Sequence, residues 1–263
     1  MRHVRGAIAD DYEMYTRLFP ELGVDEGMPS RERFANDLSR RMIVAADGTG
    51  VVGYLLYELL DGVGYVRNIV SDPAHRRSGI GRLLMDSVRE TFASSGATTW
   101  CLNVKAHNRP AIALYEQVGM GVHYLTTVLR VAKSTELPPP DPALVLDHVP
   151  PATDAIVEAE FHLLPGQLAS ARKKSGRETL QLVRGDEVLG VGVFMPVIPG
   201  SFPFRLAAPE HAATFLALLR ERAPDEASWL QVGVEDDAAL ALHVRSLGAY
   251  VHLELLHMHG PLA

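Results

Sequence analysis

Four prolines lie between positions 138 and 142 in the stretch KSTELPPPDPALVL, residues 133–146. Proline lacks a backbone N–H and fixes φ, so such a run fits neither a helix interior nor a central strand. A proline-rich segment of this kind acts as a semi-rigid spacer. Because 263 residues also exceed the usual size of one compact domain, the sequence predicts two domains, residues 1–132 and 147–263, joined by a linker over 133–146.

The composition is that of a folded, water-soluble protein, with 47% hydrophobic and 22% charged residues. This apolar content is enough to offset chain entropy, which excludes wholesale disorder. The single cysteine, Cys101, cannot form an internal disulfide. The N-terminus has acidic residues where a signal peptide needs an apolar run, and no stretch approaches the roughly 20 apolar residues of a membrane helix. We therefore expect a cytoplasmic location and no membrane partner.

The net charge of −7 is unevenly distributed. Residues 1–132 hold 15 basic and 15 acidic side chains, so the whole excess lies in residues 133–263. A neutral half beside an acidic half offers no broad basic surface, which argues against a nucleic-acid partner. The acidic half would attract a cationic partner, although a solubilising surface is the simpler explanation of any single carboxylate.

A glycine-containing turn follows three expected strands in the first half. Apolar runs around a glycine-rich turn predict a hairpin over residues 41–58, and residues 64–70 predict a further strand. The chain then reads RRSGIGR over residues 76–82, followed by apolar residues at helical spacing. Gly79 and Gly81 let the backbone approach a ligand, and the N–H groups of a new helix favour an anion such as a pyrophosphate. Taken alone, R-x-x-G-x-G is equally compatible with a tight turn, and neither G-K-[ST] nor the complete dinucleotide fingerprint is present.

A second motif follows the glycine-containing turn along the chain. After an expected strand over residues 99–104, the chain reads NRPAIALYEQVG from Asn108 to Gly119. Asn108 suits a helix N-cap, and Gly119 suits the residue after a helix. This helix and a strand expected over residues 122–131 complete the first half.

R-x-x-G-x-G followed by L-N-V and N-x-x-A-x-x-L-Y-x-x-x-G resembles the GNAT superfamily of acyl-CoA-dependent N-acetyltransferases. The resemblance covers most of residues 1–132, and its second motif is similar in style to the ribosomal-protein alanine acetyltransferases. It implies an α/β fold, of the α+β type, in which helices flank a mixed, mostly antiparallel sheet. It also implies acetyl-CoA as the acyl donor, no metal, and direct transfer to a primary amine of a small molecule or a protein.

The resemblance gives roles to residues of both motifs. Backbone N–H groups of the glycine turn would bind the pyrophosphate, and the backbone at the end of the preceding strand would pair with the pantetheine arm. Asn108 would contact that arm, and Tyr115 would donate a proton to the departing thiolate. Each also has a structural explanation, Asn108 as a helix cap and Tyr115 as a core tyrosine. The expected cofactor-binding residues are Ile69, Val70, Ser71, Arg76, Arg77, Ser78, Gly79, Ile80, Gly81, Arg82 and Asn108.

The sequence departs from the alanine acetyltransferases at the residue expected to act as general base. The alanine acetyltransferases carry a glutamate at this position, and this chain has Asn103. An amide cannot accept a proton at neutral pH. The first candidate for the base is Glu58 on the hairpin, for which an exposed strand carboxylate is the alternative. His107, His123 and a chain of water molecules are the other candidates. Cys101 is expected to be a buried strand residue.

The second half resembles a degenerate copy of the first. Residues 179–194 repeat the hairpin pattern and residues 229–248 follow the second motif, with His243 or Val244 in the place of the tyrosine. A closing strand is expected over residues 249–258, but no R-x-x-G-x-G is present in this half. We therefore predict tandem GNAT-like domains. The second would lack the CoA-binding turn and serve a structural or acceptor-binding role, in a monomer with an internal pseudo-dimer or in a homodimer.

Two functions follow from these patterns. The first is an acetyl-CoA-dependent N-acetyltransferase with Tyr115 as general acid, acting on a cationic amine such as a polyamine, an aminoglycoside or a protein amino group. The second is a non-catalytic, acyl-CoA-responsive regulatory or interaction protein. The missing strand carboxylate and the degenerate second half favour this alternative. Tyr115 discriminates between them, since a protein that only binds acyl-CoA needs no proton donor.

Overall fold

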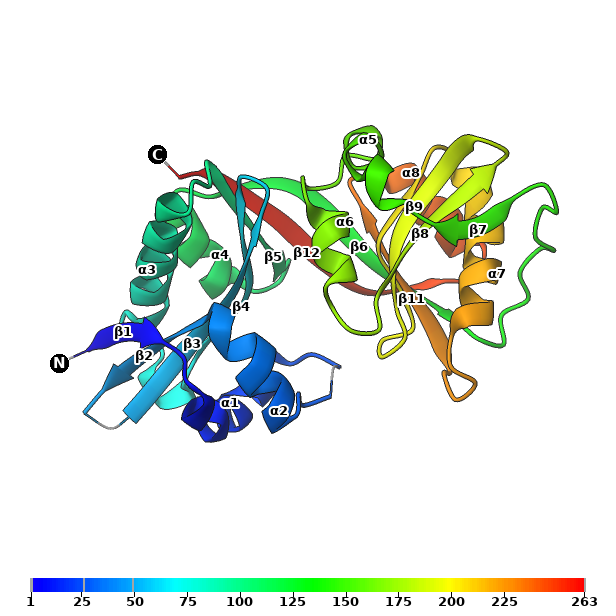
Figure 1. Ribbon diagram of the computed structural model, residues 1–263. Helices are drawn as coiled ribbons and strands as arrows, with labels where there is room; N and C mark the ends of the chain where they lie inside the picture. The colour runs from blue at the N-terminus through cyan, green and yellow to red at the C-terminus, as the bar shows by residue number, and fades with distance from the viewer. Residues whose placement is uncertain (1, 26, 49, 263) are drawn as a thin grey trace. The chain divides into compact units, whose positions relative to one another are not determined.

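The computed structural model describes residues 2–25, 27–48 and 50–262. The chain divides into two compact units: the first consists of Met1–His123 and His257–Ala263, and the second consists of Tyr124–Leu256. Figure 1 traces the elements of both units, from the blue N-terminal strand to the red C-terminal strand.

The first unit contains the hairpin, the turn and both helices expected around the two motifs, and the start of the strand expected over residues 122–131. Its strands are β1 (His3–Gly6), β2 (Met42–Asp47), β3 (Gly50–Leu60), β4 (Val63–Ser71), β5 (Thr99–Lys105), the start of β6 (Gly121–Ala132) and the end of β12 (Tyr250–Pro261). Its helices are α1 (Tyr12–Leu18), α2 (Arg31–Arg33), α3 (Ile80–Ser94) and α4 (Arg109–Gln117), with short helical segments η1 (Ala9–Asp11), η2 (Phe19–Leu22), η3 (Phe34–Leu38), η4 (Ser39–Arg41) and η5 (Pro73–His75).

The sheet of the first unit is mixed. Its strands lie in the order β1-β2-β3-β4-β5, with β12 beside β5. From β1 to β4 each strand is antiparallel to the next, whereas β4 and β5 run parallel. The β3–β4 ladder shifts register after the pair Leu56–Asn68 and resumes at Tyr57–Val66, so Arg67 is an extra residue in β4.

Strands β4 and β5 separate partway along their length. Their parallel ladder covers Val63–Val66 and Thr99–Leu102, although β4 continues to Ser71 and β5 to Lys105. We call the point where the ladder ends, at Val66 and Leu102, the fork. Beyond the fork, β5 supplies no ladder partner to the last residues of β4.

Helices cover both faces of this sheet. Tyr54 of β3 packs against Tyr15 of α1, with ring centroids 5.3 Å apart. The preceding residue, Gly53, faces the other way, and a Cβ on it would lie 2.8 Å from the side chain of Ile80 in α3. Successive strand residues point to opposite faces, so α1 and α3 lie on opposite sides of the sheet. The α1 side holds a core of buried residues that includes Phe34 and Met42.

The second unit repeats this succession of elements. Its strands are the rest of β6, β7 (Val145–His148), β8 (Glu178–Arg184), β9 (Glu187–Met195), β10 (Gly200–Leu206), β11 (Trp229–Glu235) and the start of β12. Its helices are α5 (Asp154–Glu160), α6 (Gln167–Arg172), α7 (Ala212–Arg222) and α8 (Ala238–Ser246), with η6 (Pro151–Thr153) and η7 (Pro209–His211). The order is β6-β11-β10-β9-β8-β7, parallel at β10–β11 and antiparallel elsewhere. The predicted mixed, mostly antiparallel sheet with flanking helices is therefore confirmed.

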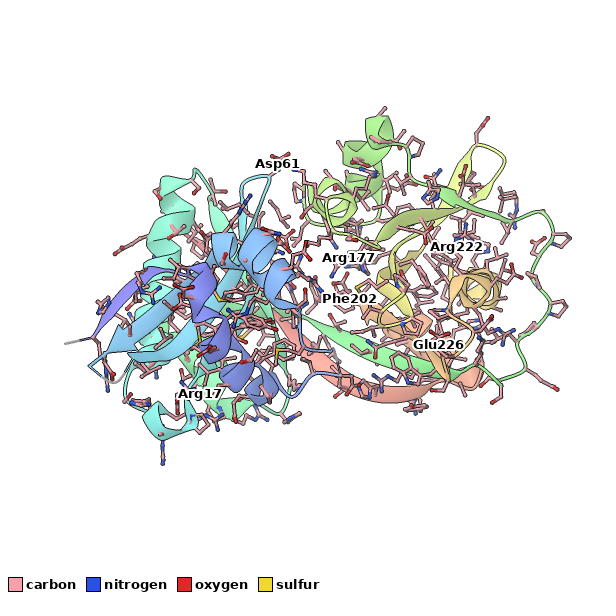
Figure 2. All side chains as sticks on the ribbon, turned by 60° about the horizontal axis from the view of Figure 1, so that its bottom comes forward. Arg17, Asp61, Arg177, Phe202, Arg222 and Glu226 are labelled. Atoms are coloured by element: carbon pink, nitrogen blue, oxygen red, sulfur yellow. The ribbon has the colours of Figure 1, made fainter. Side chains whose placement is uncertain are left out.

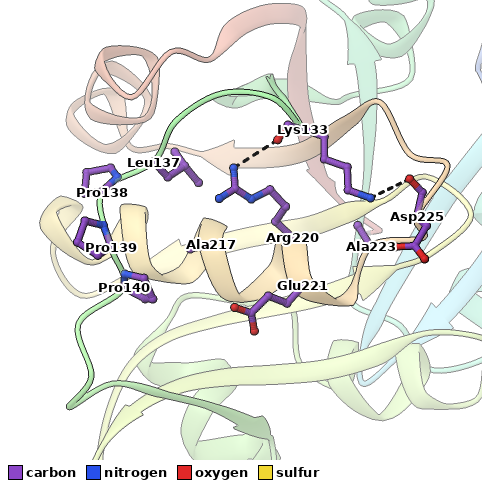
Figure 3. Close-up of a pocket in the computed structure, with 10 residues that line it drawn as sticks. All are labelled: Lys133, Leu137, Pro138, Pro139, Pro140, Ala217, Arg220, Glu221, Ala223 and Asp225. Atoms are coloured by element: carbon purple, nitrogen blue, oxygen red, sulfur yellow. Dashed lines mark hydrogen bonds between the residues drawn. The ribbon is translucent and has the colours of Figure 1, made fainter.

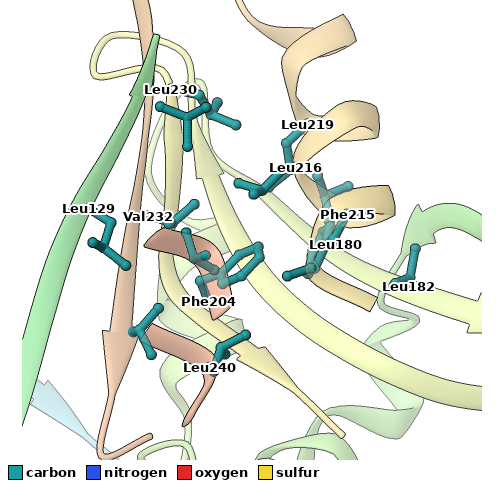
Figure 4. Packing of buried hydrophobic residues seen from close by; sticks show 14 of the residues in the cluster. Leu129, Leu180, Leu182, Phe204, Phe215, Leu216, Leu219, Leu230, Val232 and Leu240 are labelled. Carbon is teal, nitrogen blue, oxygen red and sulfur yellow. The ribbon is translucent and has the colours of Figure 1, made fainter. Parts of the chain in front are cut away.

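The core of the second unit forms where α7 and α8 pack on the strands. Phe204 of β10 stacks on Phe215 of α7 with ring centroids 5.0 Å apart. Figure 4 shows both rings among leucine and valine side chains from the strands and α7. This core also includes Leu129 and Val131 of β6, which the sequence assigned to the first domain.

The proline-rich linker packs along α7. Residues 133–144 contain neither helix nor strand. Arg220 donates to the carbonyl of Thr135 at 2.7 Å, and the hydroxyl of Thr214 accepts from the N–H of Asp141 at 3.0 Å. A pocket remains between the proline run and α7, as Figure 3 shows. Hydrogen bonds therefore hold both ends of the linker against the second unit.

The C-terminal strand enters the first unit. The sequence predicts this strand over residues 249–258 as part of the second domain, but residues His257–Ala263 pack in the first unit. The N–H of Leu262 donates to the carbonyl of Thr98 at 2.9 Å. Conversely, residues 124–132, predicted in the first domain, pack in the second unit. Strand β12 therefore supplies backbone to both units.

Within the described residues, no helix is long and apolar enough to cross a membrane.

Candidate functional site

The turn before α3 has the conformation that its glycines predict. Asp72 accepts from the N–H of Ala74 at 2.9 Å and pairs with Arg17, which Figure 2 labels. The Arg17 guanidinium, with the Ala74 N–H, holds the pKa of Asp72 below its usual range. Gly79 is the N-cap of α3 at φ 90°, and Arg77 also adopts the left-handed region at φ 56°. These left-handed residues turn the chain from η5 into the helix.

The first turn of α3 presents backbone donors. The N–H groups at the start of a helix have no intrahelical acceptor, and the helix dipole gives that end a partial positive charge. Ile80 is 1% exposed, so its side chain belongs to the core and only its backbone can serve a ligand. Ser78 is held by a hydrogen bond from its hydroxyl to the carbonyl of His75 at 2.5 Å. Backbone donors at the positive end of a helix favour an anionic ligand.

All three arginines of the motif are exposed at this end of α3. Arg76 pairs with Glu21 at 2.5 Å, and Arg82 pairs with Asp86 at 2.8 Å. Exposed pairs of this kind contribute about 0–1 kcal/mol, so a phosphate can compete for these guanidinium groups. Arg77 is exposed on the turn itself.

The two motifs meet in space. A Cβ on Gly81 would lie 2.8 Å from the Cδ2 of Leu114 in α4, so glycine permits the close approach of α3 and α4. Arg82 donates to the carbonyl of Gln117, at the end of α4, at 3.3 Å. Asn108 caps α4 by accepting from the N–H of Ala111 at 3.3 Å, which is its expected structural role.

Tyr115 lies on α4 and is 5% exposed. Burial raises the pKa of its phenol well above the usual range. The hydroxyl therefore keeps its proton at neutral pH, as a proton donor must.

The last residues of β4 have a neighbouring strand on one side only. Ile69, Val70 and Ser71 pair with Leu55, Tyr54 and Gly53 of β3. On the β5 side, the ladder has already ended at the fork. The N–H and C=O groups on that side can therefore pair with an extended ligand as with an added strand.

A group of polar side chains lies at the fork, and we call it the fork cluster: Glu58, Tyr65, Arg67, Asn103 and His257. Glu58 is 6% exposed, and Arg67 donates to its Oε2 through Nε at 2.7 Å. The Arg67 guanidinium also stacks on the Tyr65 ring, 4.0 Å from its centroid. Asn103 donates to the Tyr65 hydroxyl at 2.9 Å, and its Oδ1 lies 2.9 Å from Nδ1 of His257. The alternative explanation of Glu58 as an exposed strand carboxylate is therefore wrong, because the side chain is buried in an ion pair.

The other candidate bases lie nearer the surface. His107 is exposed in the loop before α4. His123 is also exposed, with its ring 6.3 Å from that of His257. Cys101 is buried in β5, as expected. Sequence reasoning missed Tyr65 and Arg67 of β4 and His257 of β12, because no local motif joins residues of strands so far apart in the sequence.

The second unit lacks the first motif's geometry. Helix α7 begins after the N-cap residue His211, whose φ is −75°, whereas the N-cap Gly79 of α3 has φ 90°. Asp237 caps α8 by accepting from the N–H of Leu240 at 2.8 Å, as Asn108 caps α4. Counted from these caps, Val244 holds the place of Tyr115, and it is fully buried. An aliphatic side chain there cannot donate a proton.

Comparisons with known proteins agree with this geometry. Residues 9–120 match the family model described as the acetyltransferase (GNAT) family. The ribosomal protein bS18-alanine N-acetyltransferase of Escherichia coli is 42% identical over 52 residues, which are 20% of this chain and 35% of that protein. The match thus spans about a third of the length of the curated relatives.

Two solved structures are similar over nearly the whole chain. A GCN5-related N-acetyltransferase from Sphaerobacter thermophilus has a TM-score of 0.70 at 18% identity and covers 99% of this chain and 96% of its own. A tandem GNAT protein from the clavulanic acid biosynthesis pathway has a TM-score of 0.64 at 18% identity and covers 100% and 99%. At this identity the likeness shows a common fold. Residues 9–120 are therefore similar to the GNAT family of acetyltransferases, and the chain as a whole shares the fold of these two structures.

Proposed function

We propose that this protein is an acetyl-CoA-dependent N-acetyltransferase that transfers the acetyl group directly to a primary amine. The observation that carries the proposal is the conjunction of three features in one unit. The left-handed Gly79 opens α3 as an anion site, β4 and β5 part at the fork, and the buried Tyr115 lies on the helix that packs against α3.

The cofactor would lie across these features. Backbone N–H groups from Arg77 to Arg82 would bind the pyrophosphate, with Arg76, Arg77 and Arg82 adding charge-assisted hydrogen bonds. Ile69, Val70 and Ser71 would pair with the pantetheine arm along the open side of β4, and Asn108 would contact that arm from the start of α4. A backbone N–H near the fork would polarise the thioester carbonyl.

The reaction would need no nucleophilic side chain of the protein. The neutral amine attacks the thioester carbonyl, and the C–S bond breaks as Tyr115 protonates the departing sulfur. Glu58 remains a candidate base. Its ion pair with Arg67 favours the charged carboxylate and engages Oε2.

The second unit would serve the acceptor rather than the cofactor. Valine at the place of Tyr115 and the missing glycine turn support a unit that binds no CoA by this route. The negative charge of residues 133–263 supports a cationic acceptor, such as a polyamine, an aminoglycoside or a protein amino group. The partly matching relative is by its name a ribosomal protein bS18-alanine N-acetyltransferase, so a peptide with N-terminal alanine belongs among the acceptors to be tested. The cytoplasm is the location this proposal assumes, with the protein as a monomer or a homodimer.

The test is a thiol-release assay with acetyl-CoA over these amines, paired with calorimetric titration of CoA. We expect CoA to bind and at least one amine to release thiol at a rate above that of acetyl-CoA alone. CoA binding with no amine-dependent release would instead favour the non-catalytic, acyl-CoA-responsive regulator. No CoA binding would overturn both functions.

A further inference from the structure

Two ion pairs join the turn before α3 to helix α1 and the segment η2 that follows it. Arg17 of α1 pairs with Asp72. Glu21 of η2 pairs with Arg76, with Oε2 and Nη2 2.5 Å apart. In each segment the two charged residues are four positions apart and opposite in sign, so the two segments are complementary in charge. The second pair engages the arginine that opens the R-x-x-G-x-G motif.

The two ion pairs differ in how far a ligand can reach them from solvent. The side chain of Asp72 is 12% accessible, and its carboxylate also caps η5 by accepting from the N–H of Ala74. This pair therefore belongs to the fold of the turn. The side chains of Arg76 and Glu21 are 54% and 35% accessible. A ligand can thus reach the Arg76 guanidinium and replace the carboxylate there while the turn stays folded.

The backbone that carries Glu21 is fixed by contacts other than the ion pair with Arg76. Phe19, at the start of η2, is buried in the core on the α1 side of the sheet. Gly23 ends η2 at the left-handed φ of 57°, and its carbonyl accepts from Nζ of Lys105 at 2.7 Å. The segment therefore keeps the Glu21 carboxylate within reach of Arg76, and breaking the ion pair releases only the side chain.

A phosphate group at the start of α3 would use the same guanidinium. Arg76 lies three residues before the left-handed Gly79, and the first N–H groups of the helix favour an anion. A guanidinium presents its N–H donors to carboxylate and phosphate oxygens in the same geometry, so the two anions compete for it. The phosphate is favoured in this competition because the helix donors bind it at the same time.

We propose that Glu21 competes with the cofactor for Arg76 and thereby lowers the affinity of the protein for CoA, an assignment that rests on the proposed acetyl transfer. In the free protein Glu21 holds the Arg76 side chain against η2. When CoA binds, a pyrophosphate oxygen replaces the Glu21 carboxylate on the guanidinium, and the carboxylate turns to solvent. The reverse exchange restores the ion pair when CoA leaves as product.

The substitution that tests this role is Glu21→Gln, which removes the charge and keeps the length of the side chain. We expect the dissociation constant of CoA, measured by calorimetric titration, to fall about fivefold, the upper end of what an exposed ion pair contributes. Asp37→Asn is the matched control, because Asp37 forms an ion pair with Arg41 at 2.8 Å, outside the motif. It changes the net charge equally and should leave the affinity unchanged. Unchanged affinity in Glu21→Gln, or an equal gain in Asp37→Asn, would overturn the proposal.

A double-mutant cycle separates competition for Arg76 from simple repulsion between Glu21 and the phosphate. Arg76→Gln removes the shared guanidinium, so adding Glu21→Gln to it should change the dissociation constant by less than about twofold. The same gain with and without Arg76 would show repulsion alone and would overturn the exchange. Failure of the proposed function is distinct, because it would appear as absent CoA binding by both the wild type and Glu21→Gln. Binding by the wild type with no response to Glu21→Gln would remove the exchange alone.

Discussion

Gly260 and Gly119 lie backbone against backbone, so that a Cβ on Gly260 would come within 2.6 Å of the carbonyl oxygen of Gly119. Gly119 follows helix α4, and Gly260 belongs to the part of β12 that enters the first unit. This contact seats the C-terminal strand beside the helix that carries Tyr115. Only a residue without a side chain fits there, since a backbone carbonyl cannot move aside as a flexible side chain would.

Gly260→Ala should therefore destabilise the first unit. We expect the free energy of unfolding to fall by about 1–3 kcal/mol, the usual cost of overpacking a close contact. Urea titration followed by tryptophan fluorescence in a Trp229→Phe background reports the first unit, because the other tryptophan, Trp100, is buried there. Gly6→Ala is the control, since a Cβ on Gly6 would meet nothing within 4 Å. Equal stability of the two variants would contradict the close packing of β12 against Gly119.

Tyr115→Phe should slow the chemical step and spare cofactor binding. Phenylalanine keeps the buried ring, so the packing of α4 is preserved, but it removes the hydroxyl that we propose as the proton donor. We expect kcat to fall about 100-fold or more, with the dissociation constant of CoA changed less than twofold. Rates come from thiol release and affinities from calorimetry. Tyr250→Phe, at an exposed position of β12, should leave both values at the wild-type level. A Tyr115→Phe enzyme of normal kcat would remove the proton-donor role.

Gly79→Ala should weaken CoA binding beyond its effect on stability. An L-residue at the left-handed φ of 90° costs roughly 1–2 kcal/mol, and the turn relieves this strain by moving the donors at the start of α3. We expect the CoA dissociation constant to rise about tenfold, which is ~1.4 kcal/mol. The control is Gly96→Ala. Gly96 lies just beyond the other end of α3, has φ 81°, and has open space around the position of a Cβ. Similar losses of CoA affinity in both variants would show that helix stability alone is responsible.

Asp72→Asn should lower stability in a pH-dependent way. The pKa of Asp72 is depressed in the folded protein by Arg17 and the Ala74 N–H, so the carboxylate contributes stability above its unfolded pKa of about 3.9. That contribution is lost as the pH falls through the folded pKa. Because Arg17 is half exposed, with 53% of its side chain accessible, we expect a loss of only about 0.5–1 kcal/mol at pH 7. Urea titrations at pH 7 and near pH 3 check this, and a difference that persists at the lower pH would contradict the ion-pair origin.

The hairpin, the glycine turn and the capped helix α4 could all be predicted from the sequence because their determinants are local. The left-handed Gly79 and the cap of Asn108 depend on residues within one turn of chain, and their backbone preferences act without the rest of the fold. The missing turn of the second half could be predicted for the same reason. Periodicity also located β12 as a strand, although with bounds 249–258 in place of Tyr250–Pro261.

What the sequence determined by itself is therefore the pair of GNAT-like motifs, the tandem plan and the single R-x-x-G-x-G turn. Only the tertiary structure decided which residues meet at the fork. Asn103 and His257 are 154 positions apart, and their contact requires the end of β12 to lie beside β5 of the first unit. A strand pattern specifies that a segment will pair but not with which strand, because pairing depends on the register and packing of the whole sheet. For the same reason Glu58 was ambiguous in the sequence and became a buried ion-pair partner only when Arg67 was placed in β4.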